Sequence, residues 1–242
     1  MKQLLLLTAS LLPYFIYGQD TSSTKGKRFS IGVNFSSDYC YRTLTKKEKD
    51  LSIEQWTSIK NIEDSIYIPK LGYTAGVNLD CQINERLSFQ TGIQYSNKGY
   101  KTIPILTMYN WVLPPAIAIN LTSYYYFDIP LQFTFLSHTK RKIQVIKSVG
   151  VVLNYFRKIT TKTIPEANHS TYEMLTYAST FDYDKINISP TISLGLKYNL
   201  NDRIYLRAEP TFRFSLFSTH YNDYASIHLW SAGLIFSIYS DL

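Results

Sequence analysis

Six charged residues lie at polar positions within runs that alternate polar and apolar side chains. They are Asp80, Asp128, Lys197, Arg207, Glu209 and Arg213. Charges that face one enclosed space can line a narrow pathway for a solute, or they can pair with one another and fill it. We favour filling, because a small barrel has little interior room beyond its side chains. We expect Arg207 or Arg213 to pair with Asp128, and Asp80 to be solvated near one end.

The histidines offer little support for catalysis. They are His138, His169, His220 and His228, of which His169 and His220 lie in expected loops near acidic residues. We find no metal-ligand spacing and no assignable Ser-His-Asp or Cys-His set. We therefore expect no enzyme, no metal and no cofactor. An enzyme with a rim site that uses His169 or His220 is the weakest of three functional hypotheses.

The elements that must position the charged residues show period-two alternation. Phe29, Ile31 and Val33, for example, alternate with Ser30 and Gly32. Similar runs cover 71–83, 87–96, 125–135, 148–155, 186–200, 204–216 and 230–239. Each has roughly the 10 residues that a tilted strand needs to cross a bilayer, against about 5–6 in a globular strand. The pattern predicts an all-β fold, an antiparallel up-and-down transmembrane β-barrel of about eight strands.

The connections between these runs alternate in length. Asn84-Glu85 and Asn201-Asp202 are tight turns and 137–142 is a short polar turn, whereas long connections lie near 41–70, 98–121 and 157–184, with a shorter one near 218–225. Outer-membrane barrels have long loops outside and short turns in the periplasm. We expect both termini to be periplasmic. Pro130 and Pro210 interrupt strand runs, and each indicates a bulge or bend.

The first residues are typical of a signal peptide. A basic start at Lys2 precedes a short apolar run from Leu4 to Leu12, and we expect cleavage after Gly18. Residues 19–28 are then a polar lead-in, and 29–242 form the barrel domain. Export leads to an oxidising compartment, where Cys40 and Cys81 could pair. The strand assignment places them at opposite ends of the barrel, so we predict two free thiols.

The second long connection is unusually apolar. It contains Met108, Tyr109, Trp111 and Leu113, which we take as a candidate outer-loop contact. Such a loop can cover the barrel mouth, dip into lipid or dock a partner. Alternatively, part of it simply extends the flanking strands.

The net charge of +7 is spread over turns and loops without a continuous basic stripe. We therefore expect no nucleic-acid partner. Attraction to anionic lipids or sugars of the outer leaflet fits the basic balance better.

The segment from Tyr125 to Phe133, and Asp128-Ile129-Pro130 within it, resembles the PorT-like outer-membrane β-barrel family of Bacteroidetes. Gly18-Gln19, Ser148-Val149-Gly150 and Gly233-Leu234-Ile235-Phe236 are similar to that family as well. The final residue is Leu242, where such barrels often end in Phe. The resemblance implies an eight-stranded barrel in the outer membrane of a Gram-negative cell envelope, with a link to protein export and gliding machinery.

We therefore predict an integral, non-catalytic outer-membrane barrel that serves as a scaffold or interaction component. Its expected partners are outer-membrane lipid and other envelope or secretion proteins. The alternative is a narrow transporter or lipid-handling barrel, which the inward charges would line.

Overall fold

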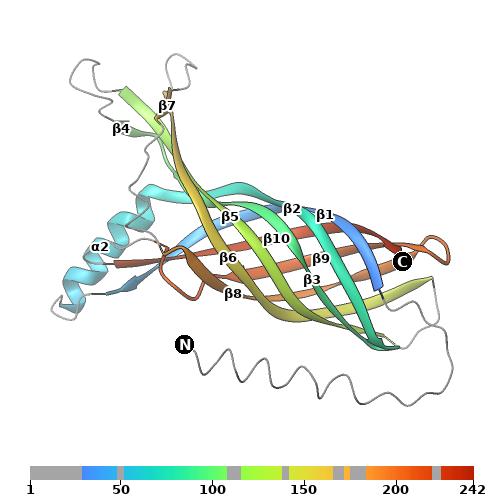
Figure 1. Ribbon diagram of the computed structural model, residues 1–242. Coiled ribbons are helices and arrows are strands. Elements are labelled where there is room, and N and C mark those ends of the chain that lie inside the picture. Colours follow the sequence, from blue (N-terminus) through green and yellow to red (C-terminus); the bar gives the residue numbers. More distant parts are fainter. Residues whose placement is uncertain are drawn as a thin grey trace.

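The computed structural model describes residues 29–47, 52–107, 116–137, 142–165, 172–174, 184–219 and 225–242. Its long strands are β1 (Phe29–Lys46), β2 (Tyr67–Asn84), β3 (Leu87–Thr102), β5 (Ala116–Leu136), β6 (Ile143–Pro165), β8 (Ile186–Asn199), β9 (Ile204–Phe214) and β10 (Ala225–Asp241). Two short strands, β4 (Ile105–Thr107) and β7 (Tyr172–Met174), and one helix, α2 (Ile53–Ile66), complete the described part (Figure 1). The expected signal peptide and lead-in, 1–28, lie outside the described residues.

The eight long strands form a closed ring. Each pairs antiparallel with its neighbours along the chain, and β1 closes the ring by pairing with β10 from Ser30↔Asp241 to Lys46↔Ala225. The predicted all-β, eight-stranded up-and-down barrel is confirmed. We call one end the turn end, because it carries the tight β2–β3 and β8–β9 turns and the C-terminus. The other, which carries α2, is the loop end (Figure 1).

The two faces of the ring reverse the usual distribution of side chains. In β1, exposed Phe29, Ile31 and Val33 alternate with buried Ser30 and Asn34. Most fully enclosed side chains are polar, whereas large apolar side chains dominate the outer surface. A bilayer solvates such an outer surface, and closure leaves no unpaired strand edge within it. The period-two pattern therefore assigned the inner and outer faces correctly.

The strands continue well beyond the predicted runs at the loop end. β1 pairs with β10 as far as Lys46, and the β5–β6 ladder reaches Ala118↔Pro165. The predicted long connections near 41–70, 98–121 and 157–184 were therefore too long. Beyond the bilayer both faces of a strand meet water, so the apolar alternation fades while the backbone ladder continues.

A four-stranded sheet projects from this end, formed by β4, β7 and the ends of β5 and β6 (Figure 1). We call it the outer extension, residues 105–107, 116–121, 161–165 and 172–174. Pro104 separates β4 from β3, as expected for a residue that cannot donate to a ladder. The ends of the apolar second connection thus extend the flanking strands, one of the two interpretations considered for it.

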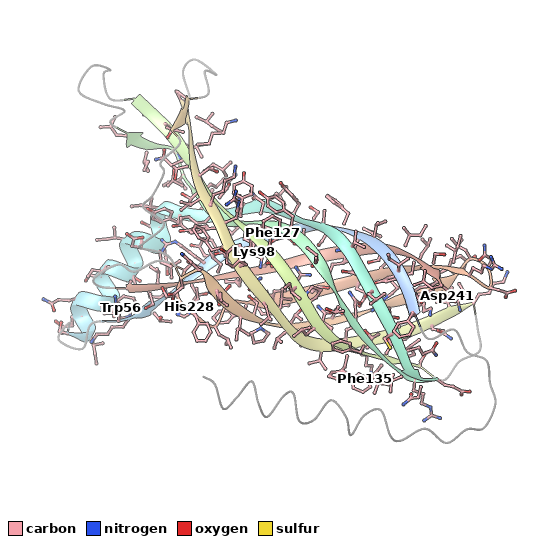
Figure 2. The ribbon with its side chains drawn as sticks, in the orientation of Figure 1. Trp56, Lys98, Phe127, Phe135, His228 and Asp241 are labelled. Atoms are coloured by element: carbon pink, nitrogen blue, oxygen red, sulfur yellow. The ribbon has the colours of Figure 1, made fainter. Side chains whose placement is uncertain are left out.

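Helix α2 was not predicted. Its N-cap is Ser52, whose hydroxyl accepts from Gln55 N while the Gln55 side chain accepts from Ser52 N, a complete capping box. The described residues include no helix long and apolar enough to cross a membrane. Trp56 of α2 packs against a cluster at the loop end, which contributes to holding the helix there (Figure 2).

Local irregularities differ from expectation. The registers of the β3–β5 and β8–β9 ladders are the same on both sides of Pro130 and Pro210, so neither proline marks a bulge. Bulges lie instead between Pro69 and Tyr73, between Gln82 and Asn84, and at Tyr125/Tyr126. Both cysteines are free thiols, as predicted.

Candidate functional site

The first interior network lies in the half of the barrel nearer the turn end. Arg207 Nε donates to Glu209 Oε1 over 2.7 Å, and Arg207 Nη1 lies 3.9 Å from Asp80 Oδ1. The three side chains are 3%, 6% and 8% exposed for Arg207, Glu209 and Asp80. The expectation that Asp80 is solvated was wrong, because long side chains from β9 reach it across the narrow interior.

Hydroxyl groups and aromatic rings complete this network. Ser148 and Ser193 both donate to Glu209 Oε2, at 3.1 and 2.8 Å. Lys197, which the sequence also predicts to face the interior, lies over the Tyr205 ring. Its Nζ is 3.7 Å from the ring centroid. Tyr205 stacks on Tyr239 with centroids 4.9 Å apart. Charged and aromatic side chains from several strands thus meet in the interior of the barrel.

A second network lies midway along the barrel. Thr74 donates to Asp38 Oδ2 over 2.6 Å, and Ser36 donates to Asp38 Oδ1 over 2.5 Å. Arg213 Nη1 donates to Thr74 Oγ1 over 3.3 Å. The buried guanidinium of Arg213 is therefore linked to a carboxylate through a hydroxyl rather than directly.

The third network surrounds Asp128, which is fully buried. Its Oδ1 accepts from Asn154 Nδ2 over 2.6 Å, and its Oδ2 lies 3.6 Å from Lys98 Nζ. The predicted pairing with Arg207 or Arg213 was wrong, since Lys98 supplies the cation of this ion pair. Lys98 falls within the segment that the alternation had assigned to a loop.

Apolar and aromatic side chains gather above these networks at the loop end. The buried cluster contains Leu44, Tyr100, Tyr124, Tyr126, Phe156, Ala225, Ile227 and Leu229. Arg42 lies beside it, 4.1 Å from the Tyr67 ring centroid, and its Nη2 donates to Glu63 Oε2 of α2 over 2.9 Å. The barrel interior therefore contains three polar networks, and an aromatic cluster lies at its loop end.

The described histidine is held by structural contacts. His228 Nε2 lies 3.1 Å from Thr45 Oγ1, and His228 Nδ1 lies 3.1 Å from the Ser215 carbonyl oxygen. The described residues contain no cluster of three or more His, Cys, Asp or Glu that could hold a metal ion. Both ring nitrogens of His228 are thus within hydrogen-bonding distance of neighbouring strand residues at the loop end.

Several predicted residues lie outside the described part. These are His138, His169 and His220, and the candidate contact residues Met108, Tyr109, Trp111 and Leu113. Sequence reasoning also missed Asp38, Lys70 and Lys98. For Asp38 the signal was available, because it continues the period-two pattern of the first strand.

Comparison with known proteins agrees with this architecture. The family described as "Outer membrane protein beta-barrel domain" matches residues 17–221. No curated protein matches the chain in sequence.

Among solved structures, the chain is similar to Neisserial surface protein A, with 10% identity, 88% of this chain and 97% of that chain covered, and a TM-score of 0.44. It is also similar to the outer membrane protein OprG of Pseudomonas aeruginosa, with 9% identity, 91% and 99% covered, and a TM-score of 0.44. A third is the outer membrane protease OmpT of Escherichia coli, with 7% identity, 92% and 99% covered, and a TM-score of 0.44. At these identities the similarity carries no statement about activity.

Proposed function

The chain belongs to the outer membrane protein beta-barrel domain family, and from that premise we propose that it is a non-catalytic interaction barrel of the cell envelope. In this proposal the barrel is a rigid anchor in the outer membrane, and its contacts with other envelope proteins lie at the loop end. Both termini are then periplasmic, and residues 1–18 are the signal peptide that directs export.

The observation that carries this proposal is the contrast between the interior and the loop end. Some interior charges form ion pairs, namely Arg207–Glu209 and Lys98–Asp128, and Arg213 is linked to Asp38 through the Thr74 hydroxyl. The outer extension, in contrast, presents apolar side chains. Leu106 and Ile117 face each other across β4 and β5 and are 68% and 52% exposed. Exposed apolar side chains on a rigid sheet are suited to contact with another protein.

The similarity of Tyr125–Phe133 to the PorT-like family supports a narrower version of the proposal. In that narrower version the partner is a protein of export or gliding machinery in a Bacteroidetes envelope. The competing function, a narrow transporter or lipid-handling barrel, would instead use the polar interior as its pathway.

Photocrosslinking in intact cells tests the proposal. A photoreactive residue replaces Leu106 or Ile117, and in the control it replaces Val149, which is 48% exposed on the outer face of β6. We expect discrete adducts with an envelope protein from positions 106 and 117 and none from 149. Lipid adducts alone at all three positions would refute an interaction role for the outer extension.

A further inference from the structure

The outer faces of β3, β5 and β6 change character over a short distance at the loop end. Tyr95, Phe127 and Tyr155 form one cross-strand row, since Tyr95 pairs with Phe127 and Phe127 with Tyr155. Phe127 is exposed on the outside of β5 (Figure 2). Tyr95 also stacks on Tyr125 with centroids 5.9 Å apart. Aromatic side chains of this kind mark the level at which a barrel leaves the hydrocarbon layer.

Cations follow directly beyond this aromatic row. Lys158 pairs with Tyr125, and its Nζ lies 4.9 Å from the Tyr125 ring centroid. The bulge at Tyr125/Tyr126 inserts Arg157 beside it, and both cations are exposed. The bulge thus places two adjacent positive charges at the edge of the aromatic row.

A second pair of cations lies farther from the barrel. Lys101 and Lys162 flank Leu121, because Leu121 pairs with Lys101 on β3 and with Lys162 on β6. Lys162 also pairs with an acidic residue, Glu173, on the neighbouring strand β7. We therefore consider Lys101, Arg157 and Lys158. The segments 95–101, 117–127 and 155–164 contain no Asp or Glu.

The opposite side of the barrel has an aromatic belt without these cations. Tyr39 and Tyr41 of β1 contact Trp230 of β10, with centroids 6.3 and 6.1 Å away. Beyond them the facing residues are Thr43 and His228. On this side the exposed Lys46, which ends β1, and Lys47 follow three and four positions beyond Thr43, whereas on the β3–β5–β6 side Lys158 contacts the Tyr125 ring directly.

We propose that Lys101, Arg157 and Lys158 form a binding site for the phosphate groups of anionic lipids in the leaflet at the loop end. The site is continuous with the lipid-facing surface, so a lipid whose acyl chains pack below Tyr95 and Tyr155 has its headgroup beside these cations. Arginine and lysine are the usual partners of phosphate, and each cation near an anionic surface strengthens binding about fivefold. Lipid binding by these cations requires no protein partner.

The test uses the full-length mature barrel in nanodiscs with no other protein. Discs contain zwitterionic phosphatidylcholine with a minor share of either lipid A or phosphatidylglycerol, and native mass spectrometry counts the anionic lipids retained. We compare the wild type with the triple variant Lys101→Gln, Arg157→Gln, Lys158→Gln. The matched control, Arg86→Gln, Lys142→Gln, Lys147→Gln, removes the same charge from exposed residues at the turn end.

We expect the wild type to retain anionic lipid in preference to phosphatidylcholine. The loop-end variant should bind it roughly 10- to 100-fold more weakly, given about fivefold per cation. The control should match the wild type. Equal loss in both variants, or no preference in the wild type, would overturn the site. Heat-shifted migration on SDS gels checks that each variant is folded.

Discussion

Replacing Glu209 with leucine is expected to destabilise the barrel by about 3–5 kcal/mol, the usual cost of breaking one side of a buried ion pair. Arg207 would keep its charge in the interior with Asp80 at 3.9 Å as its nearest carboxylate. The hydroxyls of Ser148 and Ser193 would also lose their acceptor. Urea unfolding in lipid vesicles, followed by tryptophan fluorescence, measures the change.

Two further variants show whether burial is the cause. The double variant Arg207→Met, Glu209→Leu removes both charges and should recover most of the lost stability, because apolar replacement of a buried pair is often neutral. Lys60→Gln breaks the exposed Lys60–Asp64 pair on α2 and should cost about 0.5 kcal/mol or less. A Glu209→Leu effect as small as that of Lys60→Gln would mean that the interior is hydrated and the network weak.

Substitution of Gly99 by alanine is the second change with a large expected effect. Gly99 has a φ of 143°, and a Cβ there would lie 2.1 Å from the Thr122 carbonyl oxygen on β5. Strain and displacement of the β3–β5 ladder together should cost about 2–4 kcal/mol. The midpoint of heat-modified migration on SDS gels should fall accordingly.

The matched control for Gly99 lies on the same strand. Ser96 is buried, and its hydroxyl has no hydrogen-bond partner among the described residues, so Ser96→Ala should leave the midpoint close to that of the wild type. If Gly99→Ala behaves like Ser96→Ala, the outer end of β3 relaxes freely, and the left-handed backbone there is not needed for assembly.

The sequence predicts which face of a strand a residue occupies far better than it predicts which interior charges pair with one another. Period two places Asp128, Arg207 and Glu209 on the interior side, because neighbouring side chains alternate across a sheet. Which charges meet depends on the tilt and stagger of eight strands, which the alternation does not encode. Hence Asp128 pairs with Lys98 instead of Arg207 or Arg213.

The loop-end parts of the strands were not predicted, for a different reason. Lys70 and Lys98 lie beyond the level where lipid enforces apolar alternation, so their segments read as loops although both are buried strand residues. Helix α2 did leave a signal, the Ser52 and Gln55 capping box. The family resemblance identified the fold but not the contacts at the loop end.

The interior of the barrel is closed by its own side chains, and in the proposed function the contacts with partners lie at the loop end. Single-channel recording of the purified barrel in a planar lipid bilayer shows whether the interior is closed. We predict no conductance steps above the baseline at either polarity, because charge networks and the aromatic cluster occupy the axis. Reproducible steps from the wild-type protein would contradict this claim and favour a narrow conduit.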